Sequence, residues 1–297
     1  MIDMRKTGRN GLRFMAGALA ALVVLGMIPA AAVCARAEDD LDISEIIEEI
    51  DLDAADYGGV AWSFPVALED MQPEYVVLAN KHYLLDKSYV PKPLVTVKQR
   101  KANKDGSNKN GGILKASGGE MKLREECAAA LVEMSEAARA DGIYLYLKSA
   151  YRSYQTQKTM YNNRLKKNKG KDDGWVSKPG ASDHQTGLGC DVVPKSWRNK
   201  GMNEKMAKEK ECVWMAEHCQ EYGFILRYPK DKEEVTEINY EPWHMRYVGV
   251  PVATYIMENG LYLEEFTDRL QQAIRDYLEA GGDRAKVEAF IQEPTEE

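Results

Sequence analysis

The chain has 297 residues, of which 44% are hydrophobic and 29% charged, and its formal net charge is −7. This length and composition indicate a globular protein with one large domain or two small ones, and exclude a low-complexity or repeat protein. The acidic balance argues against nucleic acid as a partner, because nucleic-acid affinity depends on basic residues that neutralise phosphates.

The first 37 residues differ in composition from the rest of the chain. Four basic residues precede an uncharged apolar run over residues 15–33, and Ala35-Arg36-Ala37 matches an A-x-A cleavage pattern. We predict a secretory signal peptide over residues 1–37. An uncleaved N-terminal anchor is the alternative, since nineteen apolar residues can just span a bilayer. A lipoprotein anchor at Cys34 ranks third. In each case we expect an exported protein, either extracellular or associated with the cell envelope.

Residues 38–74 are predicted to be an acidic spacer that leads into the folded domain. Without the first 37 residues, the chain keeps 35 basic and 46 acidic residues, which is a net charge of −11. Residues 98–112 are instead rich in Lys, Asn and Gly. We predict that they form a solvated loop. A contact with anionic wall polymers is the less favoured alternative.

The hydrophobic pattern beyond this point predicts a mixture of helices and strands. Residues 123–140 predict a helix with Cys127, Leu131 and Met134 on one face, and residues 143–149 predict a strand. Ser153 can cap a following helix. The remaining expected elements are a helix over 203–222, strands over 224–228 and 243–248, and helices over 251–260, 264–280 and 283–292. Helices and strands that do not strictly alternate predict an α+β fold with a small antiparallel sheet flanked by helices.

Two of the four histidines lie in two polar segments some fifty residues apart. His184, Asp191 and His244 supply three candidate ligands for Zn²⁺, which in a peptidase takes three protein ligands and keeps one position open for water. Glu241 then remains as the base for that water. The alternative assignment makes Glu241 the ligand and Asp191 the base.

The spacing of these residues restricts the local backbone. His184 and Asp191 are seven residues apart, too far to share a metal along one straight strand. Gly187 and Gly189 permit a turn between them. Asp191 is then expected at the start of a strand, because Val192 and Val193 follow it.

Glu241 and His244 are three residues apart, and Pro242 between them argues against a helix. In a flat strand two residues at this spacing point to opposite faces. We therefore expect a twist or a bulge that turns both side chains inward.

The two segments together, S-x-H-x-x-G-x-x-x-D followed by E-x-W-H, resemble the VanY-type zinc D-alanyl-D-alanine carboxypeptidases. That family belongs to one metallopeptidase superfamily with lysostaphin-type peptidases and the hedgehog signalling domain. Residues 149–157 (S-A-Y-R-S-Y-Q-T-Q) and 222–229 resemble further stretches of the family. The resemblance covers about residues 75–265. It implies a hedgehog-like peptidase domain there and leaves residues 266–297 as a C-terminal helical extension.

The resemblance implies hydrolysis of the bond before the C-terminal D-alanine of a peptidoglycan stem peptide, with Zn²⁺ as cofactor. Arg152 would bind the terminal carboxylate or the developing oxyanion, although on chemistry alone a surface salt bridge is equally expected. Residues matching Gln157 and Ser182 contact substrate in the family. The motifs do not distinguish a D,D-carboxypeptidase from an L,D-carboxypeptidase that acts on tetrapeptide stems.

A non-catalytic zinc-containing module that binds the cell wall is the alternative from a different class. Glu241 argues against it, because a binding site needs no base. We expect a monomer that contacts a membrane only through an uncleaved anchor.

Four cysteines follow residue 37, and they are predicted to be small buried thiols. Cys212 and Cys219 are seven residues apart on an expected helix, too far to bridge each other. Cys190 is expected to face away from Asp191 across a strand. A disulfide that involves Cys127 stays open for an exported protein.

Overall fold

The structure is a computed structural model, and it describes residues 59–100, 111–116 and 118–295. These residues belong to one compact unit, Gly59–Glu297. The expected signal peptide or anchor, most of the acidic spacer and the middle of the Lys-rich loop lie outside the described residues. Within the described part of the chain, no helix combines the length and the apolar character needed to cross a membrane.

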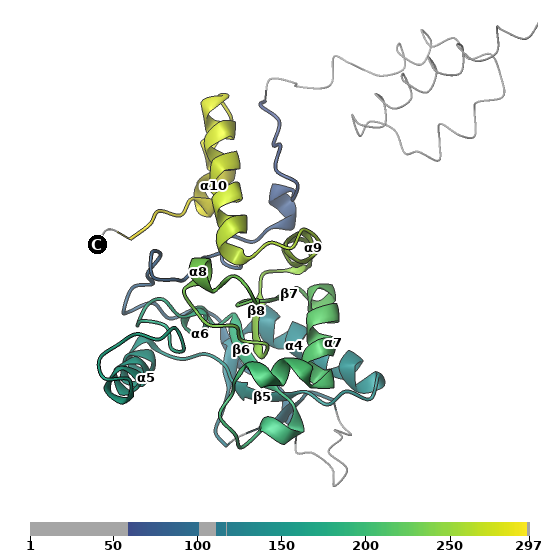
Figure 1. Ribbon diagram of the computed structural model, residues 1–297. Coiled ribbons are helices and arrows are strands. Elements are labelled where there is room, and N and C mark those ends of the chain that lie inside the picture. Colours follow the sequence, from purple (N-terminus) through teal and green to yellow (C-terminus); the bar gives the residue numbers. More distant parts are fainter. Residues whose placement is uncertain (1–58, 101–110, 117, 296–297) are drawn as a thin grey trace, which may run out of the picture. The chain divides into compact units, whose positions relative to one another are not determined.

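A six-stranded sheet carries the fold (Figure 1), with strand order β2-β3-β5-β6-β8-β7. Its strands are β2 (Gln99–Arg100), β3 (Ile113–Lys115), β5 (Tyr146–Ser149), β6 (Gly189–Val193), β7 (Phe224–Leu226) and β8 (His244–Tyr247). Strands β5, β6, β8 and β7 pair antiparallel, which confirms the predicted antiparallel sheet in an α+β fold. Strands β2 and β3 extend the sheet parallel to β5, which was not expected. β1 (Leu94–Thr96) and β4 (Lys122–Arg124) form a separate antiparallel pair.

The helices vary widely in length. They are α4 (Glu125–Ala140), α5 (Tyr154–Lys167), α6 (Asp183–Thr186), α7 (Lys210–His218), α8 (Glu233–Thr236), α9 (Val250–Glu258), α10 (Leu263–Glu279) and α11 (Arg284–Val287). Short 3₁₀-helices cover Leu68–Asp70, Lys195–Trp197, Glu204–Lys208, Cys219–Tyr222 and Glu288–Phe290. Ser153 caps α5 as predicted, because its Oγ accepts a hydrogen bond from the Thr156 backbone N–H.

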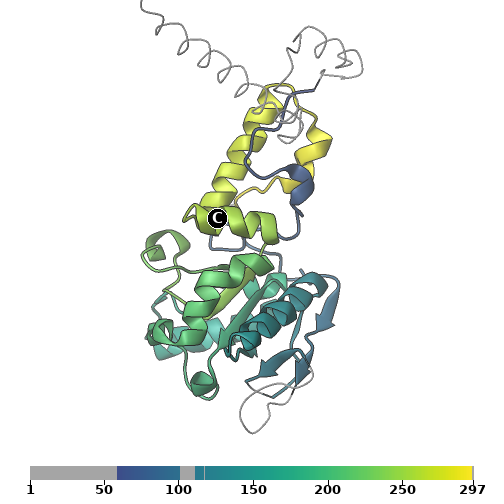
Figure 2. The same cartoon turned by 90° about the vertical axis from the view of Figure 1, so that its right-hand side faces the viewer.

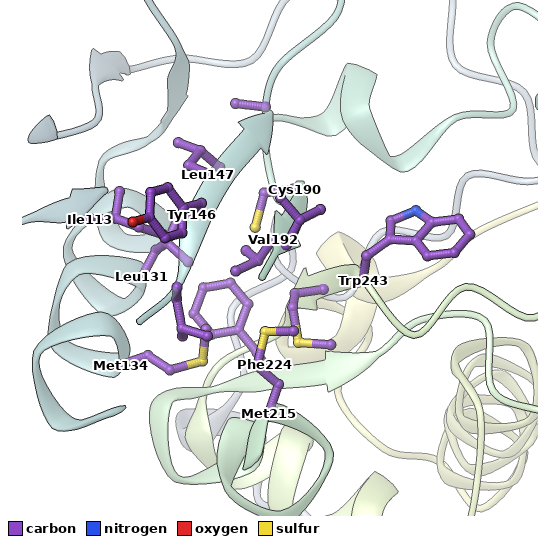
Figure 3. Close-up of a cluster of buried hydrophobic side chains, with 14 of the residues drawn as sticks. Ile113, Leu131, Met134, Tyr146, Leu147, Cys190, Val192, Met215, Phe224 and Trp243 are labelled. Atoms are coloured by element: carbon purple, nitrogen blue, oxygen red, sulfur yellow. The ribbon is translucent and has the colours of Figure 1, made fainter. Parts of the chain in front are cut away.

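Helices α4 and α7 pack against one face of the sheet (Figure 2). The predicted face of α4, with Leu131 and Met134, is buried there among strand residues (Figure 3). Cys190 and Val192 point from β6 into the same cluster. Because side chains alternate along a strand, Asp191 between them points to the opposite face. The core therefore fixes which face carries polar side chains.

A second apolar cluster lies between α9, α10 and the first described segment. The ring of Phe64 packs edge-on to Phe266 of α10, with centroids 5.6 Å apart. Figure 1 shows α10 beside this segment. The predicted helix over 264–280 is confirmed as α10, which crosses the expected boundary at residue 265. The predicted helix over 283–292 is shorter, since α11 ends at Val287 and one 3₁₀ turn follows.

The predicted helix over 203–222 is wrong as a single element. Two 3₁₀-helices and α7 occupy this stretch, and they are interrupted at Glu209, whose backbone is extended with φ −72° and ψ 138°. The Glu209 carboxylate accepts a hydrogen bond from the indole N–H of Trp197, 2.7 Å away. A tertiary contact thus coincides with the break. Gly223 ends the last turn in the left-handed conformation, with φ 76°, as predicted.

Candidate metal centre

Asp191 and His244 lie directly opposite each other on β6 and β8. Opposed residues on paired antiparallel strands share a face, so their side chains meet. His244 Nδ1 is 3.2 Å from Asp191 Oδ1, and both side chains are at most 3% exposed. Asp191 is the third residue of β6 and not its first, so the expectation that it starts a strand is wrong. Its exact pairing with His244 comes from the strand register, which the sequence did not reveal.

His184 approaches the same point from the four-residue helix α6. Gly187 ends this helix with φ 71°, a left-handed conformation that glycine adopts without strain. Gly189 brings the start of β6 against α6, because a Cβ there would lie 2.9 Å from the backbone carbon of Asp183. The two glycines therefore make the predicted turn. As a result His184 Nε2 lies 3.4 Å from Asp191 Oδ2.

The hydrogen bond of His184 to the backbone fixes which ring nitrogen carries the proton. Its Nδ1 is 2.7 Å from the carbonyl oxygen of Ala150, so Nδ1 carries the proton and donates it. The unprotonated Nε2 then faces Asp191. Burial, together with the positive charge of Arg152, lowers the pKa of His184 to about 4. The ring is therefore neutral at physiological pH, as a metal ligand must be.

These three residues fit a metal ion. One nitrogen of each histidine and one oxygen of Asp191 lie within 4.8 Å of one another, and all three residues are buried. Burial alone would raise the pKa of Asp191, but His184 and His244 hold it well below its ordinary value. The buried Oδ1 atom of Asp191 has no hydrogen-bond partner among the described residues. Two imidazoles and one carboxylate are a zinc donor set. The structure thus brings together the three predicted ligands, and their role stays a prediction.

Glu241 lies beside the cluster, in a tight turn that leads into β8. The His244 backbone N–H donates to the Glu241 carbonyl, at 3.1 Å, which closes the turn. This turn directs both side chains inward, so the expected twist or bulge within a strand is wrong. Glu241 Oε2 lies 3.4 Å from His244 Nδ1. Burial and the negative charge of Asp191 raise the pKa of Glu241 well above its ordinary value.

Arg152 extends from the loop after β5 toward the ligand cluster. Its Nη2 lies 3.2 Å from Asp191 Oδ2 and 2.5 Å from His184 Nε2. Two further hydrogen bonds hold the guanidinium, one to Ser149 Oγ at 3.1 Å and one to Gln157 Oε1 at 3.0 Å. The side chain is 17% exposed. Arg152 therefore forms a salt bridge, but within the candidate site and not on an exposed surface. Its binding of a carboxylate or oxyanion stays a prediction.

The two predicted substrate contacts are both buried. Gln157 is 1% exposed, and while its Oε1 accepts from Arg152, its Nε2 donates to the Ser177 carbonyl at 2.8 Å. Gln157 thus links Arg152 to the loop that precedes α6. Ser182 is 3% exposed and occupies the N-cap position of α6, but its side chain makes no capping bond there. Substrate contact by either residue stays a prediction.

Asp183 was not among the expected site residues, although it directly precedes His184. Asp183 is fully buried and lies against two arginines, Arg227 and Arg246. Two aromatic neighbours of the site were not expected either. The ring of Tyr228 packs on that of His244 at 4.9 Å between centroids. Tyr228 lies in residues 222–229, which resemble a stretch of the family. This resemblance could have identified it as a candidate site residue.

Trp175 is the second missed aromatic residue. It stacks on Trp243 with centroids 6.3 Å apart and an interplanar angle of 11°. The Asn239 side chain donates to the Asp173 carbonyl at 2.7 Å, which ties the Trp175 loop to the segment before Glu241. No sequence signal connected these two segments.

The comparisons with known proteins agree with this geometry. Residues 120–250 match the sequence profile of the family VanY, described as D-alanyl-D-alanine carboxypeptidase. The putative carboxypeptidase YodJ of Bacillus subtilis (strain 168) is 37% identical over 208 residues, which are 69% of this chain and 72% of that protein.

Two solved structures are also similar. The structure of the LdcB LD-carboxypeptidase, described as revealing the basis of peptidoglycan recognition, has a TM-score of 0.56 and 35% identity, over 66% of this chain and 87% of that one. VanYB in complex with D-alanine-D-alanine has a TM-score of 0.50 and 29% identity, over 65% of this chain and 97% of that one.

Proposed function

Because the chain belongs to the VanY family of D-alanyl-D-alanine carboxypeptidases, we propose that it removes the C-terminal D-alanine from peptidoglycan stem peptides as a zinc-dependent D,D-carboxypeptidase. One observation carries this proposal. A buried cluster of two histidines and one aspartate lies beside a buried carboxylate, Glu241, and a guanidinium, Arg152. A module that only binds zinc and cell wall needs no base, so Glu241 favours the enzyme.

In this site His184 Nε2, His244 Nδ1 and the Asp191 carboxylate would hold the zinc ion. Zinc bound there supplies a water of lowered pKa and polarises the scissile carbonyl. Glu241 accepts the proton of the attacking water and donates it to the leaving amine. Its raised pKa makes Glu241 a stronger base than an ordinary carboxylate, which favours the first of these steps.

Arg152 supplies the cation that a carboxypeptidase requires. Its planar guanidinium can pair with the terminal carboxylate of the substrate or with the oxyanion that develops at the scissile carbonyl. Gln157 and Ser149 hold it from two sides, so little side-chain entropy remains to be lost on binding.

L,D-carboxypeptidase activity on tetrapeptide stems is the second candidate. It is favoured by the likeness to LdcB, whose TM-score of 0.56 and identity of 35% exceed the 0.50 and 29% found for VanYB.

Incubating the purified zinc-loaded protein with pentapeptide and tetrapeptide muropeptides, and weighing the products, tests both candidates. Loss of one alanine from the pentapeptide alone supports D,D activity, and loss from the tetrapeptide alone supports L,D activity. If the protein binds both muropeptides but cleaves neither, it is a non-catalytic module that binds the cell wall.

We further propose that the protein is exported and cleaved after Ala37, on the basis of the basic, apolar and A-x-A segments of the sequence. N-terminal sequencing of the protein from the cell envelope and the medium is expected to start at Glu38. A start at Met1 in the membrane fraction would support the uncleaved anchor. A protein confined to the cytoplasm would contradict both.

A further inference from the structure

Behind the metal cluster lies a set of buried charges. Asp183 contacts two arginines, with Arg227 Nε 2.7 Å from its Oδ2 and Arg246 Nη1 2.5 Å from its Oδ1. All three side chains are 0% exposed. Arg246 Nη2 also donates to the backbone carbonyls of Tyr75 and Val77, at 2.9 and 2.6 Å. A buried charge is costly unless it is paired, so each of these groups depends on the others.

The same network reaches helix α10, which lies outside the matched family region. Arg227 pairs with Glu264 through two parallel bonds, Nη1 to Oε2 at 2.8 Å and Nη2 to Oε1 at 2.6 Å. Asn80 Nδ2 donates to Glu264 Oε1 at 3.4 Å. Both Glu264 and Asn80 lie outside residues 120–250, which match the family profile. Two segments beyond the matched region therefore complete the network.

The network meets the metal cluster at His244. Its Nδ1 faces Asp191 and Glu241, so Nε2 is left on the opposite side of the ring. Nε2 is buried without a hydrogen-bond partner in the described structure, and it faces Asp183 Oδ2 at 4.0 Å. The contact between Arg227 Nε and Oδ2 is an ion pair without hydrogen-bond alignment, so Oδ2 keeps the capacity to accept a proton donor.

We propose that Asp183 is a positioning residue. Its carboxylate accepts the Nε2–H of His244 and so orients the imidazole ring with Nδ1 toward the metal. Glu264 of α10 in turn holds Asp183 in place through Arg227. Imidazole ligands generally donate their second N–H to such an acceptor, which fixes the tautomer and the ring orientation. The inference rests on the proposed zinc site.

The first test measures zinc affinity directly, by chelator competition on the purified full chain. Asp183→Asn removes the charge and keeps the shape, and we expect roughly 10–100-fold weaker zinc binding, as for other partners behind a ligand. Glu264→Gln is expected to cause a smaller loss in the same direction, since it acts through Arg227. Activity is not needed for this readout.

Gln271→Leu is the matched control on the same helix. Gln271 is also buried, donating to the Phe290 carbonyl at 2.8 Å and accepting from the Gln292 N–H at 3.1 Å, but it does not contact the charge network. It should lower Tm without weakening zinc binding. If Asp183→Asn and Glu264→Gln also lose only Tm, the network is merely structural and the proposal is overturned.

A measurement on the unaltered protein covers the case in which a variant does not fold. The chain has four histidines, and ¹⁵N NMR of the zinc-loaded, histidine-labelled protein resolves their tautomers. We expect His244 to carry its proton on Nε2. A proton on Nδ1 would overturn the proposal. Absence of zinc binding by the unaltered protein would instead overturn the proposed function, and this inference with it.

Discussion

The structure places the side chain of Arg152 beside the candidate metal ligands. From the sequence alone, a surface salt bridge and a substrate-binding role were equally expected for Arg152. We expect Arg152→Ala to lower kcat/KM by about 10²-fold or more, comparable to losing an oxyanion donor. Arg152→Lys should not restore full activity, because lysine lacks the planar fork that pairs with a carboxylate. Steady-state kinetics on a D-Ala-terminated stem peptide provide the measurement. Zinc content and Tm should barely move. Near-normal turnover in Arg152→Ala would exclude a role in catalysis.

Glu241 and Asp191 are predicted to fail in different ways. Glu241→Gln keeps the shape of the side chain but cannot take a proton, so we expect nearly full zinc and activity lower by roughly 10²–10⁴-fold. Asp191→Asn should lose zinc and activity together, because Asp191 is proposed as a ligand. Bound zinc and peptide hydrolysis are measured on both variants. If Glu241→Gln loses zinc while Asp191→Asn keeps it, Glu241 is the ligand and Asp191 the base.

The residues proposed to bind the metal and to act in the reaction could be predicted from the sequence, whereas the residues that contact them from behind could not. His184 and His244 stand in two short motifs, each of which also contains a carboxylate suited to a metal site. The partners of Asp183 lie far away in the sequence, with Glu264 joined to it only through Arg227. No local period or spacing reports such a contact, because it arises from packing between elements.

Among the local elements, the turn after α6 is expected to be sensitive to substitution at Gly187. Gly187→Ala forces a left-handed residue with a Cβ, costing about 1–2 kcal/mol. The new Cβ would also lie 3.0 Å from Pro91 Cγ and 3.1 Å from Leu94 Cδ2. We expect Tm to fall by about 2–8 °C. Zinc affinity should fall as well, because the turn places His184 against the strand that carries Asp191.

Gly142→Ala is the control for the backbone term alone. Gly142 has φ 75°, and a Cβ there would meet no atom within 4 Å. Thermal melts and chelator competition on both variants separate the two effects. Equal losses of Tm with unchanged zinc affinity would show that the Gly187 turn does not position His184.

At the level of elements, prediction succeeded where a pattern was long and failed where tertiary contacts decided. The apolar residues of α4 predicted a clear buried face. The four antiparallel strands were marked by alternating apolar residues or by neighbouring turn residues. Strands β2 and β3 have only two and three residues, too few for a period to be seen. The helix predicted over 203–222 is interrupted at Glu209, which bonds Trp197 from an earlier segment.

The molecule as a whole is expected to keep its thiols unreactive. Four cysteines are buried and free in the described structure. Burial raises the pKa of Cys212 and of Cys219 to about 12, and it raises the pKa of Cys127 above its ordinary range. At pH 8 these groups are therefore protonated as well as inaccessible. We expect no reaction with Ellman's reagent at pH 8 in the native protein without residues 1–37, which contain Cys34.

Unfolding in guanidinium without reductant supplies the comparison. All four thiols should then react, because no disulfide joins them in the structure. A deficit of two thiols in the unfolded protein would reveal a disulfide and contradict the arrangement described here.

The C-terminal end of the described chain contacts a segment near its beginning, and this contact bears on the order in which the protein folds. Gln292 Oε1 accepts from the Leu78 N–H at 2.7 Å across 214 residues, and Thr295 Oγ1 accepts from the Leu84 N–H at 2.7 Å across 211 residues. Contacts between such distant residues form slowly, because a long loop must close before they can stabilise anything. Because the chain is synthesised from its N-terminus, His184 and His244 are made before α10 with its Glu264. We therefore expect the metal-binding geometry to mature only after the C-terminal residues have docked.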